Sequence, residues 1–495
     1  MRVTNIMNFV RTFEPRDPEI EKLLFDTTKK QLRLCNDMGL PATFLLEYDA
    51  LVNTEYIDFF KAEAGKNIEI GFWYEVVEPL TTDIGIPYES KRGYKWDWCI
   101  KPGFSMSYTN DVKEKLIDQA MAKFREVFGY YPKTVASWVL DTYSVNYLTN
   151  KYDIDALAIC RDQVNTDAYT LIGGYFNGIY YPSKNNIFTP ASCKENQNST
   201  PMFKLLGPDP IHNYDNSKHL SSKDKLIGVY TLEPACSGGR DPEIVDWFFR
   251  TYYDNENLGI GYTQIGQENS FANIDLITPL DMQFKKLMKM GVKFEKMCDT
   301  GAAFKEKYTL TPPAAVSALD NWDTEDCQTV YYSSKNYVAN ILRHDNKVAI
   351  RSLYLFDDRI KDTYIENSCN TFDSIHENMP IVDTFPQRGN GDGGDGIILS
   401  VSASDISSVR MEDSLKVSFG NGNVRFHEEH IVIEGSTFDF TPEMCATSIT
   451  TTSSSIEYEY KGHKYALEIL GGRVENTNGH ITVTGDKITL IPTKR

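Results

Sequence analysis

Two kinds of segment alternate through the first 300 residues of this 495-residue chain. Short β-branched or aromatic runs are followed by amphipathic runs of helical period, a pattern typical of β/α units around a parallel sheet. We count seven or eight such units, which predicts a distorted β/α barrel. The expected strands are residues 2–9, 42–47, 68–73, 134–139, 155–160, 226–232, 259–265 and 292–296.

Several helices in these units have recognisable ends. Asp17 can cap a helix that begins at Pro18, and Gly39 follows the expected last turn of that helical region. Asp241 and Pro242 open another helix in the same way. Further helices are expected at residues 110–128, 142–152 and 279–290.

The pattern changes at two places. Residues 162–225 are rich in Asn, Gly, Pro, Ser and Tyr, and we expect them to form a long loop over the barrel mouth. After Asp320 the helical period ends and alternating strand-like runs begin. The sequence therefore predicts an α/β fold with a distorted (β/α)7–8 barrel over residues 1–325 and a C-terminal β-sandwich-like domain over residues 326–495.

The charge of the chain argues against nucleic acid as a partner. Its net charge is −18, whereas nucleic-acid binding depends on Lys and Arg that neutralise phosphates. No run approaches the ~20 apolar residues of a membrane span, so no membrane association is expected. The first residues also lack a secretory signal. We expect a cytoplasmic protein, or a periplasmic or secreted one whose signal was removed, with its nine cysteines reduced.

Polar and aromatic side chains follow seven of the expected strands. In a β/α barrel the active site forms where the strands end, so these side chains should meet at one rim. Carboxylates, amides, arginines and tryptophans together fit a polyol substrate and acid catalysis. The residues are Asn8, Arg11, Glu47, Asp49, Trp73, Glu75, Trp138, Asp141, Arg161, Asp162, Glu233, Gln267, Glu268 and Asn269.

Glycoside cleavage needs one carboxylic acid and one carboxylate beside the scissile bond, and the rim can supply this pair. Each carboxylate also has a structural alternative. Asp141 directly precedes a helix and can equally be its cap, and a structural role is the more frequent one for Glu47 and Asp49. Glu268 is the stronger candidate, because residues 267–270 place four hydrogen-bonding side chains directly after an apolar run.

A metal-dependent mechanism lacks ligands in the barrel. The chain has eight His, of which only His212 and His219 fall in the barrel region, so we expect no metal and no other cofactor. His212 lies in the expected long loop. For this side chain a place in a sugar subsite and a structural role are equally open.

Three segments carry a resemblance to known proteins. Residues 35–45, Cys-Asn-Asp-Met-Gly-Leu-Pro-Ala-Thr-Phe-Leu, look like the helix and second strand of polysaccharide deacetylases. Residues 68–73, Ile-Glu-Ile-Gly-Phe-Trp, resemble their third strand, and residues 137–141, Ser-Trp-Val-Leu-Asp, resemble the segment after strand four in glycoside hydrolase family 57. Residues 1–300 thus resemble the superfamily that joins polysaccharide deacetylases to glycoside hydrolases of families 57 and 38, and within it a bacterial family of such barrels.

This resemblance implies roles for individual residues. Asp141 takes the place of the catalytic nucleophile of family 57, and Glu268 takes the place of its acid/base. Glu233 is the next carboxylate to consider. Trp73 and Val77 stand where deacetylases have metal-binding histidines, so the resemblance implies an altered metal site.

Our main hypothesis is a retaining glycoside hydrolase or transglycosidase that acts on an oligosaccharide or polysaccharide. Trp73, Trp138 and Tyr48 are its candidate sugar-stacking residues. Two alternatives stay open, namely a polysaccharide deacetylase-like enzyme with an altered metal site, and a carbohydrate-binding protein without catalysis. The further expected substrate-binding residues are Arg11, Glu75, Arg161, Asp162, His212, Gln267 and Asn269.

Overall fold

The computed structural model describes residues 2–166, 168–207, 209–212, 231–255, 257–323, 325–384, 396–442 and 448–495. Its first part contains the strands β1 (Arg2–Val10), β2 (Ala42–Leu46), β3 (Ile68–Trp73), β4 (Thr134–Ala136), β5 (Ala156–Cys160), β6 (Gln163–Thr166), β7 (Tyr169–Leu171), β8 (Ile179–Tyr180), β9 (Met202–Leu205), β10 (Gly261–Ile265) and β11 (Lys293–Glu295).

One curled sheet joins most of these strands. Its order is β10-β1-β2-β3-β4-β5-β9-β8, with β11 paired to β1, and its neighbours are parallel except for β8. The central strands are buried along nearly their whole length, as parallel strands covered on both faces must be. The sheet does not close, because β10 and β8 at its two ends are not paired in the described part of the chain. The expected α/β barrel is thus present as an open barrel.

The segment that we expected to be a long loop carries part of this sheet. Residues 162–225 contain β6 to β9, and β9 takes the position next to β5. The described part of the segment is therefore more than a loop. The strand expected at residues 226–232 lies mostly outside the described residues.

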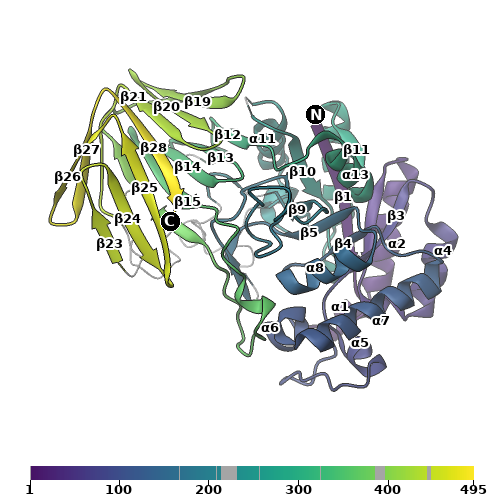
Figure 1. The fold of residues 1–495 in the computed structure, drawn as a ribbon. Coiled ribbons are helices and arrows are strands. Elements are labelled where there is room, and N and C mark those ends of the chain that lie inside the picture. Colours follow the sequence, from purple (N-terminus) through teal and green to yellow (C-terminus); the bar gives the residue numbers. More distant parts are fainter. Residues whose placement is uncertain are drawn as a thin grey trace.

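Helices cover the outer face of the sheet (Figure 1). Asp17 accepts hydrogen bonds from the backbone N–H groups of Glu19 and Ile20 at the start of α1, and Asp241 caps α11 in the same way, as expected. The helices are α1 (Pro18–Glu21), α2 (Leu24–Asp37), α3 (Tyr48–Leu51), α4 (Thr54–Glu63), α5 (Glu78–Asp83), α6 (Ile100–Gly103), α7 (Asn110–Phe128), α8 (Thr142–Lys151), α10 (Ser237–Arg240), α11 (Pro242–Tyr253), α12 (Ile277–Lys289) and α13 (Met297–Lys307).

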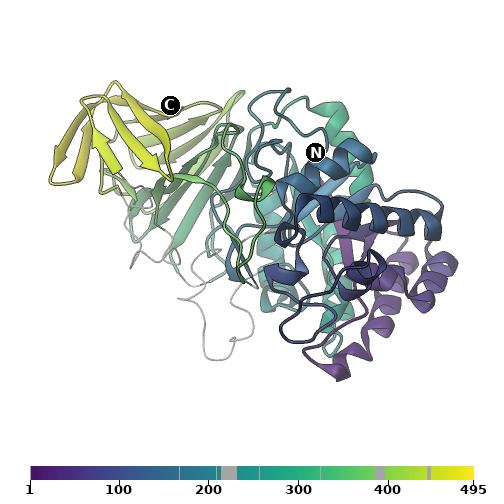
Figure 2. The same ribbon diagram turned by 60° about the horizontal axis from the view of Figure 1, so that its bottom comes forward.

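The second part of the chain is antiparallel β-structure, which Figures 1 and 2 show gathered on one side of the molecule. Its first strand begins at Ala314. Its strands are β12 (Ala314–Ala318), β13 (Cys327–Ser333), β14 (Tyr337–His344), β15 (Lys347–Leu355), β16 (Met379–Asp383), β17 (Ile397–Leu399), β18 (Ile406–Arg410), β19 (Ser414–Phe419), β20 (Gly422–His427), β21 (Ile431–Glu434), β22 (Phe438–Phe440), β23 (Ser448–Thr451), β24 (Ser455–Tyr460), β25 (His463–Leu470), β26 (Arg473–Thr477), β27 (His480–Thr484) and β28 (Lys487–Lys494).

Two large sheets share one hydrophobic core here. The first runs β12-β13-β14-β15-β17-β22-β27-β26, with β16 beside β15, and the second runs β18-β19-β20-β21-β28-β25-β24-β23. Ile341 and Ile350 of the first sheet belong to the same buried cluster as Val417 and Leu490 of the second. A β-rich C-terminal region is therefore confirmed, and its two layers pack as in a β-sandwich.

The segment between β15 and β16 packs against the barrel part. Figure 1 shows it in green beside α6, and the backbone N–H of Ile100 donates to the carbonyl of Phe372. Farther along the barrel surface, Lys113 of α7 donates to the carbonyl of Tyr364 at 2.9 Å. The β-rich region thus contacts loops close to the carboxyl ends of the barrel strands.

Two expectations about the whole chain can be compared with the structure. Within the described residues, no helix has the length and apolarity needed to cross a bilayer. The cysteines in the described part of the chain are free.

Candidate active site

A cavity of about 290 Å³ lies at the carboxyl ends of the parallel strands. Its walls come mainly from residues at or after the ends of β1, β4, β5, β9 and β10, where a β/α barrel places its active site. The lining residues are Arg11, Arg16, Trp96, Trp138, Cys160, Arg161, Gln163, Tyr169, Leu206, Thr231, Glu233, Glu268 and Phe271.

Glu268 follows β10 and is nearly buried at the cavity wall. Its Oε1 accepts a hydrogen bond from the Ser270 hydroxyl at 2.6 Å, and its Oε2 is 3.3 Å from Nη2 of Arg11. The carboxyl group therefore has a fixed orientation and a cationic neighbour.

Glu233 is the second carboxyl group of the lining. Its Oε1 accepts a hydrogen bond from Nε2 of Gln267 at 3.1 Å. Burial raises the pKa of Glu233 to about 7, with a further upward contribution from the charge of Glu268. The two carboxyl groups thus interact, and Glu233 is poised to hold a proton near neutral pH.

Arg11 links the cavity to buried groups behind it. Its guanidinium lies over the rings of Trp96, at 3.7 Å from the centroid, and Phe9, at 4.4 Å. Burial acts to lower the pKa of Arg11, but the carboxylates of Glu268, Glu47 and Glu75 raise it on balance. Arg11 therefore stays charged inside the wall of the cavity.

Five of the residues expected from the sequence meet in this cavity, and two more support them. Glu75 accepts hydrogen bonds from the indole N–H groups of Trp73, at 2.9 Å, and Trp96, at 2.6 Å. Gln267 orients Glu233, as described above. The five residues in the lining are Arg11, Trp138, Arg161, Glu233 and Glu268.

Asp141 lies elsewhere. It caps α8 by accepting from the backbone and hydroxyl of Ser144, and it also accepts from Ser105 Oγ at 2.5 Å. Lys113 forms a fully buried ion pair with it at 3.1 Å. Each oxygen of the Asp141 carboxylate thus accepts hydrogen bonds from two donors. The side chain is not part of the cavity lining. Geometry favours the structural alternative for Asp141.

Three other expected substrate contacts are packed inside the protein. Trp73 is fully buried and stacks on Phe9 with ring centroids 4.2 Å apart. The Tyr48 hydroxyl donates to Asp83 at 2.5 Å, and its ring is buried. Asn269 exchanges hydrogen bonds with the backbone of Arg11. None of these three side chains lines the cavity.

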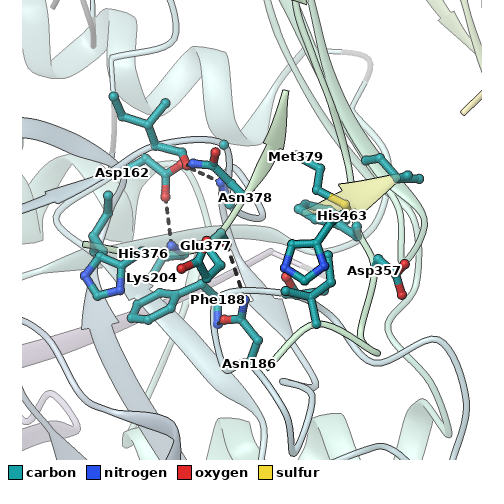
Figure 3. A pocket seen from close by; sticks show the side chains of 18 residues that line it. Asp162, Asn186, Phe188, Lys204, Asp357, His376, Glu377, Asn378, Met379 and His463 are labelled. Carbon is teal, nitrogen blue, oxygen red and sulfur yellow. Dashed lines mark hydrogen bonds and ion pairs between the residues drawn. The ribbon is translucent and has the colours of Figure 1, made fainter. Parts of the chain in front are cut away.

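Asp162 and His212 belong to the junction with the β-rich region. Figure 3 shows Asp162 joined to Lys204 in a second, narrower cavity, where the buried pair is 2.9 Å apart. His212 lies 3.1 Å from the amide oxygen of Asn321 and packs edge-on against Trp322. His212 therefore links the two parts of the chain, whereas Asp162 pairs within the barrel part, and neither lines the cavity that contains Glu233.

Trp96 forms a wall of the cavity and was not predicted from the sequence. The segment Tyr94-Lys95-Trp96-Asp97-Trp98 between β3 and α7 was an available signal, since tryptophans in a loop after a barrel strand are candidates for ligand contact. Glu47 was considered but not selected. It is fully buried with no hydrogen-bond partner on either oxygen, and its pKa is raised well above the ordinary value by burial and by the neighbouring Asp49.

The residues do not fit the metal that deacetylases with a His-rich third-strand site would hold. Trp73 and Val77 occupy those positions, and Trp73 donates its indole N–H to Glu75. Within the described residues, no group of three or more His, Cys, Asp or Glu side chains has the spacing of metal ligands.

Comparisons with known proteins support the fold. No protein-family model and no curated protein sequence matches the chain. Its structure is similar to that of a putative glycoside hydrolase/deacetylase from Parabacteroides distasonis, with a TM-score of 0.54 and 12% identity over 78% of this chain and 91% of that one. At this identity the likeness shows a shared fold.

Two further likenesses are too weak to support a conclusion. A putative polysaccharide deacetylase from Mycobacterium smegmatis has a TM-score of 0.38 at 11% identity, over 62% of this chain and 91% of that one. A probable polysaccharide deacetylase from Pseudomonas aeruginosa PAO1 has a TM-score of 0.40 at 9% identity, over 62% and 93%.

Proposed function

We propose that this protein is a hydrolase that modifies a carbohydrate, and that the cavity containing Glu233 and Glu268 is its active site. The observation that carries the proposal is the difference between the two carboxyl groups. Glu233 has a pKa of about 7, whereas Glu268 is ion-paired with Arg11. A pair of interacting carboxyl groups in different environments is how proteins provide an acid and a base at one site.

The first candidate reaction is removal of an acyl group from a sugar. Glu268 takes a proton from water, and the oxygen of that water attacks the acyl carbon. The resulting oxyanion lies near the guanidinium groups of Arg11 and Arg161, which stabilise negative charge. Glu233 then gives its proton to the leaving oxygen or nitrogen as the bond to the acyl carbon breaks. The two arginines in the lining favour this reaction over glycoside cleavage.

The second candidate is cleavage of a glycosidic bond, which the carboxyl pair alone favours. Glu233 would protonate the departing oxygen, and Glu268 would act as nucleophile or as base. This assignment replaces Asp141, whose oxygens are occupied by Lys113 and by cap hydrogen bonds. Trp138, which is half-buried in the lining, would stack on the sugar ring in either reaction.

One experiment separates the candidates. The protein is incubated with acetylated and with free oligosaccharides, and both acetate and new reducing ends are measured. Acetate release that disappears in Glu233→Gln and Glu268→Gln supports deacylation, whereas new reducing ends support glycoside cleavage. Saturable sugar binding without either product contradicts the proposal and supports a binding protein. Activity that survives in both variants places the active site elsewhere.

A further inference from the structure

Glu75 has an unusual pair of partners for a buried carboxyl group. It follows β3, is fully buried, and accepts the indole N–H of Trp73 on Oε1 and that of Trp96 on Oε2. Trp73 belongs to the rigid sheet, and Trp96 belongs to the long segment between α5 and α6. Glu75 therefore ties a loop side chain to the barrel.

The loop side chain in turn covers Arg11. The Trp96 ring is 3.7 Å from the Arg11 guanidinium carbon, and Phe9 lies against the same guanidinium at 4.4 Å. Both aromatic contacts are cation–π interactions, which are stronger away from water. Trp96 thus limits where the guanidinium can turn.

More than one carboxyl group acts on Arg11. Glu268 takes its Nη2, while its Nε and Nη1 have no hydrogen-bond partner, and neither do the two oxygens of Glu47. The charged groups that act on Arg11 are Glu268, Glu47, Glu75 and Arg16. A guanidinium that was free to rotate could leave Glu268 and pair with Glu47.

We propose that Glu75 is a positioning residue, which holds Trp96 over Arg11 and thereby keeps Arg11 paired with Glu268 instead of Glu47. The inference rests on the proposed function of this cavity, because its consequence for rate depends on Glu268 taking part in catalysis. The arrangement of the side chains can be tested without any turnover.

The main test compares Glu75→Gln with Glu69→Gln. The amide of the first variant keeps one acceptor and cannot accept the second indole N–H. Glu69 is the matched control, because it is a nearly buried carboxyl group on β3, the strand that Glu75 follows, and it is bonded to Thr43 and Thr134 away from the cavity. The indole N–H signal of Trp96 and the Nε signal of Arg11 in ¹H–¹⁵N spectra should move in Glu75→Gln and stay in Glu69→Gln.

Kinetics supply the second readout. Glu75→Gln should lower kcat by roughly tenfold to hundredfold, the range expected for loss of one hydrogen bond to a charged group, with a smaller change in KM. Because Glu75 acts through Arg11, its effect should nearly vanish in an Arg11→Ala background. Additive effects in this double-mutant cycle overturn the inference.

A second variant covers the case in which Glu75→Gln does not fold. Trp96→Phe keeps the charge of Glu75 but removes the indole donor that ties the loop to it, so the ring is no longer held over Arg11 and the Arg11 signal should shift as in Glu75→Gln. Unchanged Arg11 signals in both variants overturn the inference. If the protein hydrolyses no carbohydrate but the signals move as expected, the positioning role stands and the proposed function fails.

Discussion

At the scale of single residues, the protonation of Glu233 sets the pH range of the proposed reaction. An acid catalyst works only while it holds its proton. Because burial raises the pKa of Glu233 to about 7, the proton is present below pH 7 and is lost as the pH rises through that value. Activity should therefore fall on the alkaline side of neutrality.

The first prediction concerns this group. Glu233→Gln should lower kcat by about 10²–10⁴ and should remove the alkaline limb near pH 7, because glutamine cannot donate a catalytic proton. The pH–rate profiles of both proteins provide the measurement. Gln267→Ala is a second variant to compare, because it removes the hydrogen bond to Glu233 but keeps the carboxyl group. In this variant the alkaline limb of the pH–rate profile should remain and its midpoint should shift. An unchanged limb in Glu233→Gln would show that another group is the acid.

The second prediction separates the two interpretations of Asp141. Asp141→Asn leaves Lys113 buried without its ion-pair partner, so it should destabilise the protein by about 3–5 kcal/mol. Chemical denaturation measures this loss. The fraction that remains folded should turn over substrate at close to the normal rate. A variant of unaltered stability that lacks turnover would instead restore Asp141 as the nucleophile.

These residues show how far sequence patterns reach. Arg11, Trp138, Arg161, Glu233 and Glu268 could be placed at one site because residues after parallel strands share an edge. The local sequence of Asp141 gave no way to choose between catalysis and capping, since Lys113 and Ser105 approach it only in the folded chain. Trp96 was missed because it lies in a loop far beyond the end of β3.

At the scale of elements, one glycine allows β10 to lie close to β1 just before Glu268. Gly266 follows β10 with a φ of 125°, and a Cβ atom there would collide with the backbone of Met7 on β1. The close approach of the two strands therefore requires glycine at this position.

The third prediction follows from this contact. Gly266→Ala should lower the free energy of unfolding by about 1–3 kcal/mol. It should also lower activity, because β10 must move away from β1 and Glu268 moves with it. Gly65→Ala is the control, because Gly65 has no positive φ and its new Cβ would meet only Asn36 at 3.5 Å. Thermal unfolding and kcat of both variants give the comparison. Equal stability and activity in the two variants would contradict the expectation.

Element by element, the strands that could be predicted are those with long apolar runs. The bounds of β3 and α7 match the expected ranges, residues 68–73 and 110–128. In contrast, β9 has only four residues, Met-Phe-Lys-Leu, within a polar segment. Its interior Lys204 is tolerated because Asp162 neutralises it, and that partner is visible only in three dimensions.

At the scale of the whole molecule, the barrel and the β-rich region share buried contacts. Phe176 and Tyr331 stack with centroids 3.6 Å apart, and Thr142 donates to Asp362 at 2.7 Å. Side chains from both parts belong to one hydrophobic cluster. Separating the two parts would therefore expose these buried side chains to water.

The fourth prediction is that the two parts unfold together. Differential scanning calorimetry should show one transition whose calorimetric and van't Hoff enthalpies agree. Asp362→Ala removes the acceptor of Thr142 and should lower the single Tm without splitting the transition. Two separate transitions in the unaltered protein would show that the shared contacts contribute little.

The pairing of β1 has a consequence for the order of events during synthesis. Residues 2–6 of β1 pair with β10, and residues 3–5 also pair with β11, whose residues lie near position 294. At ribosomal rates of about 5–20 residues per second, these partners are made on the order of 15–60 s after β1. During that interval a strand of mostly apolar residues has open edges, so the nascent chain should depend on a chaperone until β11 has left the ribosome.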